Sequence, residues 1–350
     1  MPVNYSSYRA VDPAYTGFLA TTKPTQNYIG RALTPRISVN SPDYAGKVWV
    51  DTHVGAMGTP QSLVVTPGAP LPRMTTQDPS TVSYSCDIYG LASSGLPKVR
   101  AARSQVPVDL VQREQAILMD ALLIAEEVRY AALYGTSGNW TTTVACGSMT
   151  GGTQWSSATA TPLTDLHDYL VTYLAAAHGN AATDIIIPYP VAAAMGKTSE
   201  LRGALPLAVS TQSLAVQAGR PMNVQAVAAV IAQEFGLRVH IGSARYNTAN
   251  LGQSHTETWV WGEAVWLGTL MGNAMQDGAN VRTVATAALG IDEISALADA
   301  GLAELGSPMS AGVDELSPSA GNAWIPYVQH AADEIVVSAN LGATITNCLA

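Results

Sequence analysis

The sequence has few charged residues. Only 12% of its 350 residues are Asp, Glu, Lys or Arg, about half the share that is usual in soluble proteins. A chain with so little charge has little with which to cover a free surface. We therefore expect neighbouring molecules to cover much of that surface, as in an obligate assembly. A stable extracellular enzyme rich in Ala, Thr and Ser is the alternative class that this composition allows.

A basic excess is also missing. The formal net charge is −9, which argues against direct binding of nucleic acid, because such binding needs clustered Lys and Arg. No apolar run reaches the length of a transmembrane helix, and the first residues have neither the basic start nor the apolar core of a signal peptide. We expect no membrane association and no secretion.

Cysteine is scarce as well. The three cysteines, Cys86, Cys146 and Cys348, are too few for a disulfide framework, and an odd number leaves at least one thiol free. This usage fits a protein made in a reducing cytoplasm. Cys86 lies in a strand-like run, where a buried structural role is favoured over that of a nucleophile.

The sequence contains no recognisable cluster of catalytic or metal-binding residues. None of the six histidines has the spacing of metal ligands, and the sequence contains neither a Gly-x-Ser-x-Gly elbow nor a Walker-type loop. His240 and His255 could meet across a sheet, with Glu257 close by, but structural roles are favoured for them. We expect no catalytic residue, no cofactor and no metal site.

One long helical pattern is present, over residues 108–134. Asp109 is the expected N-cap, and Gly135 provides the stop. At about 1.5 Å per residue the helix would be roughly 40 Å long, and three-and-four spacing of apolar residues predicts one buried face. The predicted buried stripe consists of Ile117, Ala121, Ile124, Val128 and Ala131, widened by Leu110, Leu118, Leu122 and Ala125; the charged residues mostly off it are Glu114, Glu126, Glu127 and Arg129.

Strand and helix signals alternate through the rest of the chain. This alternation is typical of a compact α/β domain after the long helix. Strands are expected at 44–51, 82–91, 183–188 and 237–241 and as two runs within 256–271, and helices at 163–178, 191–204, 224–235 and 292–302. Residues 140–161 are expected to be mostly loop, and the remainder of 273–322 has no clear pattern.

Motifs on both sides of the long helix occur in a recognisable order. They are Tyr84-x-Cys86-x-x-Tyr89-x-Leu91, Arg100-Ala-Ala-Arg103, Pro107-x-Asp109-Leu110, and Tyr134-Gly followed by Asn139-Trp140. This ordered set resembles the major capsid proteins of tailed bacteriophages, which have the Hong Kong 97 fold. The chain departs from that family at residues 93–98, where relatives have an acidic cluster, and at 125–127, where they have a basic pair.

The resemblance implies an α+β fold with four parts. These are an N-terminal arm at 1–43, an extended β-hairpin loop at 44–91, a peripheral domain formed by 92–161 and 313–350 with the spine helix at 108–134, and an axial domain at 162–312. The extended loop would lie over an adjacent subunit, and the arm would clasp another neighbour. None of the four lysines lies between residues 52 and 80, so we expect no lysine–asparagine cross-link between subunits.

The implied function is structural. Copies would assemble as hexamers and pentamers into an icosahedral shell that encloses double-stranded DNA without sequence-specific binding. An acidic lining would keep the DNA from adhering. The expected location is the virion capsid, assembled in the host cytoplasm. Expected partners are further copies of the chain, a separate scaffolding protein (because the sequence starts directly with the arm), a portal and a cement or decoration protein. Candidate inter-subunit contacts are Arg73, Asp78, Lys98, Arg100, Arg103, Glu126, Glu127 and Arg129.

Three other functions compete with this interpretation. An encapsulin-like nanocompartment shell would share the fold, but the long N-terminal arm favours the phage protein. A secreted hydrolase is disfavoured, because neither a signal peptide nor a convergent catalytic set is present. A decoration or tail protein is disfavoured because the resemblance spans almost the whole chain.

Overall fold

The computed structural model describes ten stretches of the chain. They are residues 24–39, 46–50, 80–97, 110–177, 180–204, 222–249, 252–270, 283–289, 309–315 and 323–350. The predicted N-cap Asp109 and the predicted helix 292–302 lie outside them. Within the described residues, no helix combines the length and apolarity needed to cross a bilayer.

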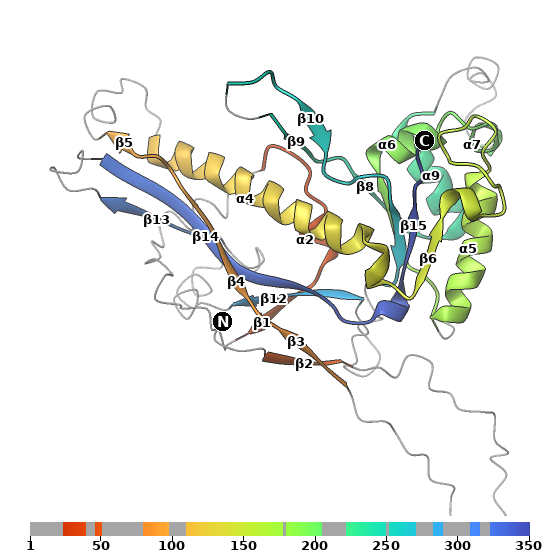
Figure 1. Cartoon of the computed structure of the whole chain (residues 1–350), viewed down its shortest axis with the longest axis horizontal. Helices are drawn as coiled ribbons and strands as arrows, with labels where there is room; N and C mark the ends of the chain where they lie inside the picture. The colour runs from red at the N-terminus through yellow and green to blue at the C-terminus, as the bar shows by residue number, and fades with distance from the viewer. Residues whose placement is uncertain are drawn as a thin grey trace, which may run out of the picture.

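A six-stranded sheet and one long helix form the elongated part of the molecule (Figure 1). The strand order is β1-β12-β14-β13, and β4 and β5 also pair with β14. The elements are β1 (Arg36–Val39), β4 (Asp87–Ala92), β5 (Leu96–Pro97), β12 (Val284–Leu289), β13 (Ser310–Glu315), β14 (Ala323–Val336) and the helix α4 (Leu110–Gly135). The helix packs along β14, where Met119, Leu122 and Leu123 meet Met309, Ala311 and Val328.

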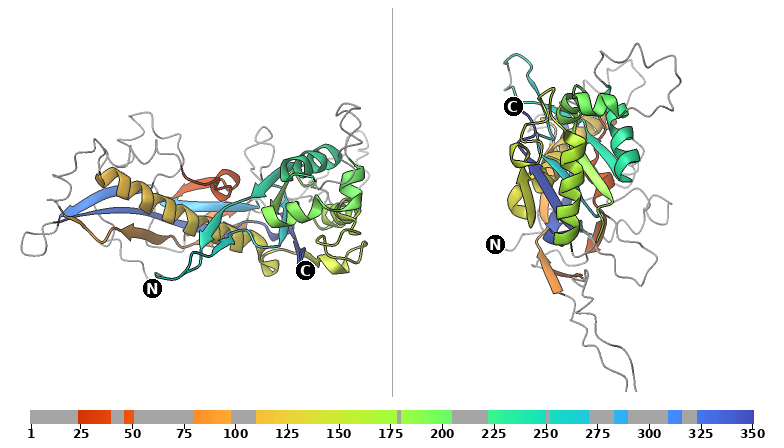
Figure 2. Two further views of the ribbon diagram at one scale, coloured as in Figure 1. Left: turned by 90° about the horizontal axis from the view of Figure 1, so that it is seen from above. Right: turned by 90° about the vertical axis from the view of Figure 1, so that its right-hand side faces the viewer.

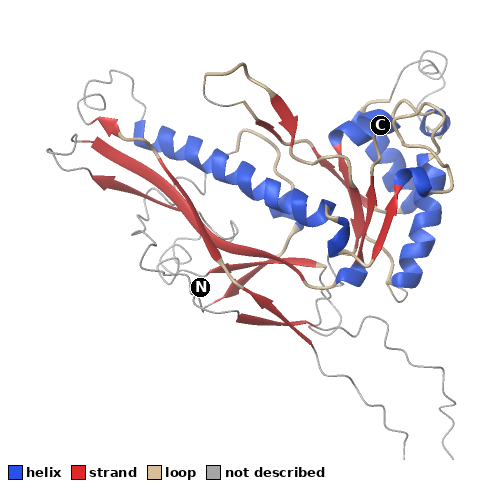
Figure 3. Cartoon of the chain, viewed as in Figure 1, coloured by secondary structure: helices blue, strands red, loops and turns tan. Residues whose placement is uncertain are grey.

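A five-stranded sheet surrounded by shorter helices forms the other part, at the right of Figure 3. Its order is β6-β15-β11-β7-β8, with β7 parallel to β8 and β6 parallel to β15. The elements are β6 (Thr142–Ala145), β7 (Asp184–Pro188), β8 (Arg238–Gly242), β11 (Val265–Gly268), β15 (Gly342–Thr346), α5 (Pro162–Ala176), α6 (Tyr189–Met195), α7 (Ser199–Gly203) and α9 (Val224–Phe235). The largest buried apolar cluster lies between this sheet and its helices.

Two hairpins and an N-terminal strap complete the described structure. The hairpins are β2 (Gly46–Val50) with β3 (Ser80–Tyr84), and β9 (Arg245–Asn247) with β10 (Glu257–Trp259). The strap, residues 24–39, includes the short helix α2 (Gly30–Leu33) and β1. It crosses α4 and joins the chain's own six-stranded sheet (Figures 1 and 2).

An aromatic cluster at the end of α4 joins the two sheets. The Tyr134 ring lies 4.9 Å from the Trp266 ring and 6.1 Å from the Trp261 ring. The Trp140 indole donates a hydrogen bond to the carbonyl oxygen of Tyr134 at 3.0 Å. Trp266 belongs to β11, so these contacts fix the last turn of the helix against the second sheet.

Several predicted elements are confirmed, and others differ from the prediction. The long helix, the helix 224–235 and the strands at 44–51, 183–188 and 237–241 are present, within a residue or two at each end. The single strand predicted at 82–91 is two strands that break at Ser85 and Cys86, and the helix predicted at 191–204 is α6 followed by α7. Strands β6, β12 and β13 were not predicted.

The domain boundaries stay a prediction. Strands β6 and β15, which the sequence division assigns to the peripheral domain, lie in the five-stranded sheet, where β15 pairs with β11 and β6 pairs with β15. Strand β12, assigned by sequence to the axial domain, pairs with β14.

Candidate functional site

The buried face of α4 is not the one that the apolar pattern predicts. Ile117 and Val128, both in the predicted stripe, are 53% and 38% exposed. The buried residues are Val111, Gln115, Met119, Leu122, Leu123, Glu126, Glu127, Tyr130 and Tyr134. Leu122 is the only residue of the predicted stripe in this set. The helix carries apolar residues on both sides, so spacing alone does not decide which side faces the core.

Glu127 is buried because three N–H groups surround its carboxylate. It accepts hydrogen bonds from the backbone of Ile29 at 3.0 Å and of Gly30 at 2.9 Å, and from the indole of Trp261 at 2.6 Å. Burial raises the pKa of Glu127, and these hydrogen bonds oppose the rise. The carboxylate thus serves the amide groups at the start of α2, which have no partner within that helix.

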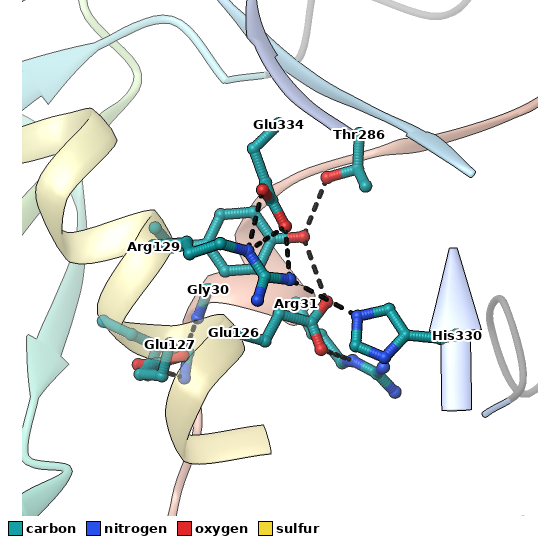
Figure 4. A network of polar contacts seen from close by, with 10 residues as sticks. Gly30, Arg31, Glu126, Glu127, Arg129, Thr286, His330 and Glu334 are labelled. Atoms are coloured by element: carbon teal, nitrogen blue, oxygen red, sulfur yellow. Dashed lines mark hydrogen bonds and ion pairs between the residues drawn. The ribbon is translucent and has the colours of Figure 1, made fainter. Parts of the chain in front are cut away.

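Glu126 and Tyr130, which also lie on α4, belong to the same hydrogen-bond network. The Arg31 Nε donates to Glu126 at 2.7 Å, and the Tyr130 hydroxyl donates to Glu126 at 3.4 Å. The same hydroxyl lies 2.7 Å from the hydroxyl of Thr286 on β12. Figure 4 shows how these side chains link the strap, the helix and the sheet.

Arg129 connects the helix to β14. Its guanidinium donates to both carboxylate oxygens of Glu334, at 2.9–3.1 Å, and lies 3.3 Å from the imidazole Nε2 of His330. It also lies over the ring of Tyr89, 3.7 Å from the centroid. Burial alone would lower the pKa of Arg129, but the Glu334 carboxylate outweighs it and the pKa is raised.

This network changes the interpretation of three predicted contact residues. Glu126 and Glu127 are each 1% exposed, and Arg129 is largely covered. The prediction that these charges lie off the buried face of α4 is wrong, because partners from the strap and from β14 satisfy them inside one chain. The other five predicted contacts, Arg73, Asp78, Lys98, Arg100 and Arg103, lie outside the described residues.

The opposite face of α4 carries a continuous exposed apolar line. We call it the outward stripe: Ile117, Ala121, Ala125, Val128 and Ala132, all of them exposed. Ile124 beside it is half-buried. Successive members are three or four residues apart, so they lie on one side of the helix. Exposed apolar residues gathered on one side of a helix are a candidate surface for contact with another chain.

Helix α5 exposes a second, smaller apolar pair. Val171 is 61% exposed and Leu174 is 42% exposed, whereas Leu166, Tyr169 and Tyr173 are buried. The N-terminus of this helix is capped by Glu200, whose carboxylate accepts from the backbone N–H groups of Leu163 and Thr164, and not by the side chain of a residue at its start.

A groove of about 760 Å³ adjoins the outward stripe at Ile124. The rings of Tyr189 and Trp259 stack there at 4.8 Å, and Arg245 pairs with Glu257 at 2.8 Å. His255 lies 3.1 Å from Glu257, whereas His240 pairs with Asp184, so the two histidines serve different carboxylates. Among the described residues, no group of three or more His, Cys, Asp or Glu side chains is placed to hold a metal ion.

Comparisons with known proteins give matches among solved structures. No protein-family model and no curated protein sequence matches the chain. A phage-related protein from Bordetella bronchiseptica superimposes with a TM-score of 0.65 at 16% identity, over 97% of this chain and 98% of that one.

Two further solved structures are more distant. The putative capsid protein of a prophage from E. coli CFT073 gives a TM-score of 0.48 at 11% identity, over 99% of each chain. The capsid of cyanophage P-SCSP1u gives 0.49 at 10% identity, over 97% of this chain and 93% of that one. At such low identities a structural likeness establishes the fold, and here the match to the Bordetella protein establishes it. The α+β fold of the Hong Kong 97 type that the resemblance predicted is therefore confirmed.

Proposed function

We propose that this chain is the major capsid protein of a tailed bacteriophage. Copies of it would form hexamers and pentamers that tile an icosahedral shell around double-stranded DNA. The observation that carries the proposal is the outward stripe of α4, where Ile117 is 53% exposed and Val128 is 38% exposed in the single chain. The fold shared with a phage-related protein agrees with it.

Burial of the outward stripe would contribute favourable free energy to association between copies. Burying a fully exposed Ile or Val side chain is worth about 1.5–3 kcal/mol, so Ile117 at 53% exposure and Val128 at 38% would each contribute roughly half of that, and a closed shell repeats the contact in every subunit. Val171 and Leu174 on α5 provide a second apolar surface. With only 12% charged residues, the chain also has few charged groups to desolvate when copies come together.

The predicted polar contacts belong to this proposal. Arg73, Asp78, Lys98, Arg100 and Arg103 remain proposed contacts between subunits. Glu126, Glu127 and Arg129 act first within the chain: the two glutamates hold the strap against α4, and Arg129 holds α4 against β14. In a shell they would support an interface through that strap.

The proposed partners follow from the same role. DNA would be enclosed without sequence-specific contacts, consistent with the net charge of −9. A portal, a separate scaffolding protein and a cement protein complete the proposed set. The mature location would be the virion capsid, after assembly in the host cytoplasm.

Electron microscopy of the purified, unfixed protein at high concentration tests the proposal. We expect rings of five or six subunits, or closed shells, with scaffolding protein supplied by co-expression if the chain alone stays dispersed. Shells that contain enzymes and no DNA when isolated from the native source would favour the nanocompartment alternative. Dispersed monomers under both conditions would contradict a shell-forming role.

A further inference from the structure

Two of the three cysteines share one buried site. Cys146 and Cys348 are both 0% exposed and belong to the apolar cluster of the five-stranded sheet. All three cysteines are free thiols in this structure. Cys86 is also buried, but it lies in a separate cluster with Tyr84 and Ile335.

The strand pairing brings the two cysteines together. Ala145 at the end of β6 is the partner of Thr346 at the end of β15, and parallel neighbours lie about 4.8 Å apart. Cys146 follows Ala145 directly. Asn347 has a left-handed backbone with φ of 53°, which turns the chain so that Cys348 returns towards Cys146. The backbone N–H of Trp155 holds the carbonyl oxygen of Cys348 at 3.0 Å.

The two thiols are chemically unequal. The neighbouring Cys348 thiol lowers the pKa of Cys146, against the effect of burial. The Cys146 thiol donates to the carbonyl oxygen of Thr153 at 3.6 Å, and the Cys348 thiol donates to that of Ile345 at 3.5 Å. Burial raises the pKa of Cys348. Cys86 differs from both, because burial and then the nearby Asp333 and Asp87 raise its pKa to about 12. Cys146 is therefore the thiol that ionises first, with a proton donor already beside it.

We propose that Cys146 and Cys348 form an oxidation site that closes into an intrachain disulfide when the protein meets a hydroperoxide. The proposal concerns one chain and does not depend on the proposed shell function. The bond would fasten the segment 347–350 to the turn that follows β6. It would close a loop of about 200 residues, and bonds that close long loops restrict the unfolded chain most.

The chemistry balances with hydrogen peroxide as the oxidant. The Cys146 thiolate attacks one peroxide oxygen, the O–O bond breaks, and Cys146 becomes a sulfenic acid as hydroxide leaves. The Cys348 sulfur then attacks the Cys146 sulfur, the S–O bond breaks, and the released hydroxide takes the Cys348 proton. In total two thiols and one peroxide give one disulfide and two waters. Asn347 and Ala350 on either side of Cys348 are exposed, so local opening of this segment admits the oxidant.

Mapping of the full-length protein after native oxidation tests the proposal. The protein is treated with hydrogen peroxide, remaining thiols are alkylated after denaturation, and digested fragments are analysed by mass spectrometry without reduction. We expect linked fragments containing Cys146 and Cys348, two hydrogen atoms lighter than the separate ones, with Cys86 alkylated. Wild-type protein suffices for this measurement, so it does not depend on whether a variant folds.

Variants and thermal unfolding provide the controls. Cys86→Ser should still form the link, and both it and the wild type should unfold several degrees higher after oxidation, reversibly with a thiol reductant. Cys348→Ser should show no such rise. Oxidation of Cys86 alone, or of Cys146 to a sulfinic acid with no link to Cys348, would overturn the proposal.

Discussion

Individual buried carboxylates hold the strap to the long helix, and each is stable there because hydrogen-bond donors surround it. Glu127 accepts three N–H donors, two of them from residues nearly a hundred positions earlier in the chain. Gly30 is required at one of those positions, because an added Cβ would clash with the Tyr130 ring and lie 2.9 Å from a carboxylate oxygen of Glu127. The fit leaves no room for a side chain there.

Removal of the Glu127 carboxylate should strongly destabilise the fold. Glu127→Ala leaves three buried donors without an acceptor, and we expect the free energy of unfolding to fall by about 3–5 kcal/mol. Glu114→Ala, on the same helix but partly exposed, should change it by less than about 0.5 kcal/mol. Urea unfolding of the dissociated chain measures both. Equal shifts in the two variants would contradict the role given to Glu127.

Asp184 at the start of β7 gives the fold an acid-sensitive contact. Its carboxylate is 2.6 Å from the Arg238 guanidinium and 2.8 Å from the His240 imidazole. Burial opposes ionisation, but the hydrogen bonds from His240, Thr183 and Arg238 outweigh it, and the pKa of Asp184 lies below its usual 3.8. Because the unfolded chain takes up the proton first as pH falls, the stabilisation is present above pH 3.8 and is lost as pH falls through the lower, folded-state pKa.

Asp184→Asn tests this pH dependence. Near neutral pH we expect the variant to be less stable by about 2–3 kcal/mol, because a charge-assisted contact is lost. The difference in unfolding free energy between variant and wild type should shrink below about pH 4, as the wild-type carboxyl becomes protonated. Denaturation series at several pH values measure it. A difference that stays constant down to the lowest accessible pH would show that the charge of Asp184 does not contribute.

At the scale of elements, the two faces of α4 have different roles. The inner face meets β14 through Met119, Leu122 and Leu123 and meets the strap through Glu126 and Glu127. The outer face presents the outward stripe to the surroundings. Folding therefore depends on one face and the proposed assembly on the other.

Truncation on each face should separate the two roles. Met119→Ala removes a side chain that is only 6% exposed and should lower the free energy of unfolding by about 2–5 kcal/mol. Ile117→Ala, at 53% exposure, should leave it within about 0.5 kcal/mol of the wild type. Chemical denaturation at low protein concentration compares them. A large loss for Ile117→Ala would mean that this side chain contributes to the single chain's core.

Local signals explain which elements the sequence reveals. Helix α9 is predicted in full, because Asn223 caps its start through a bond to the Ala226 N–H, and Gly236 takes the left-handed conformation after its end. Strands β12 and β13 are missed because their Ala- and Gly-rich stretches lack alternation and pair with strands distant in sequence, β12 with β1 and β14 and β13 with β14. The inner face of α4 is mispredicted because burial of Glu126 and Glu127 depends on Arg31, Gly30 and Trp261, which are distant in sequence.

At the scale of the whole molecule, the proposed shell subunit has a charge-poor surface that other copies would complete. Non-covalent burial then has to hold the shell together. The four lysines all lie outside residues 52–80, the outer part of the predicted extended loop, so that part has no lysine for a cross-link to an asparagine of a neighbour.

Assembled particles should therefore dissociate fully in denaturant. On a reducing denaturing gel we expect one band at the mass of a single chain. A ladder of covalent oligomers that survives boiling and reduction would contradict this prediction and would indicate that one of the four lysines forms a cross-link.

The most direct test of the central claim is the sedimentation of the wild type beside the double variant Ile117→Glu/Val128→Glu, under the conditions in which the wild type assembles. Ala229→Glu, an equivalent change at an exposed position of α9, is the control. We expect the wild type and the control to sediment as capsomers or shells, and the double variant as folded monomers with unchanged circular dichroism. Assembly of the double variant to the same extent as the wild type would contradict the claim that the outward stripe of α4 holds the shell together.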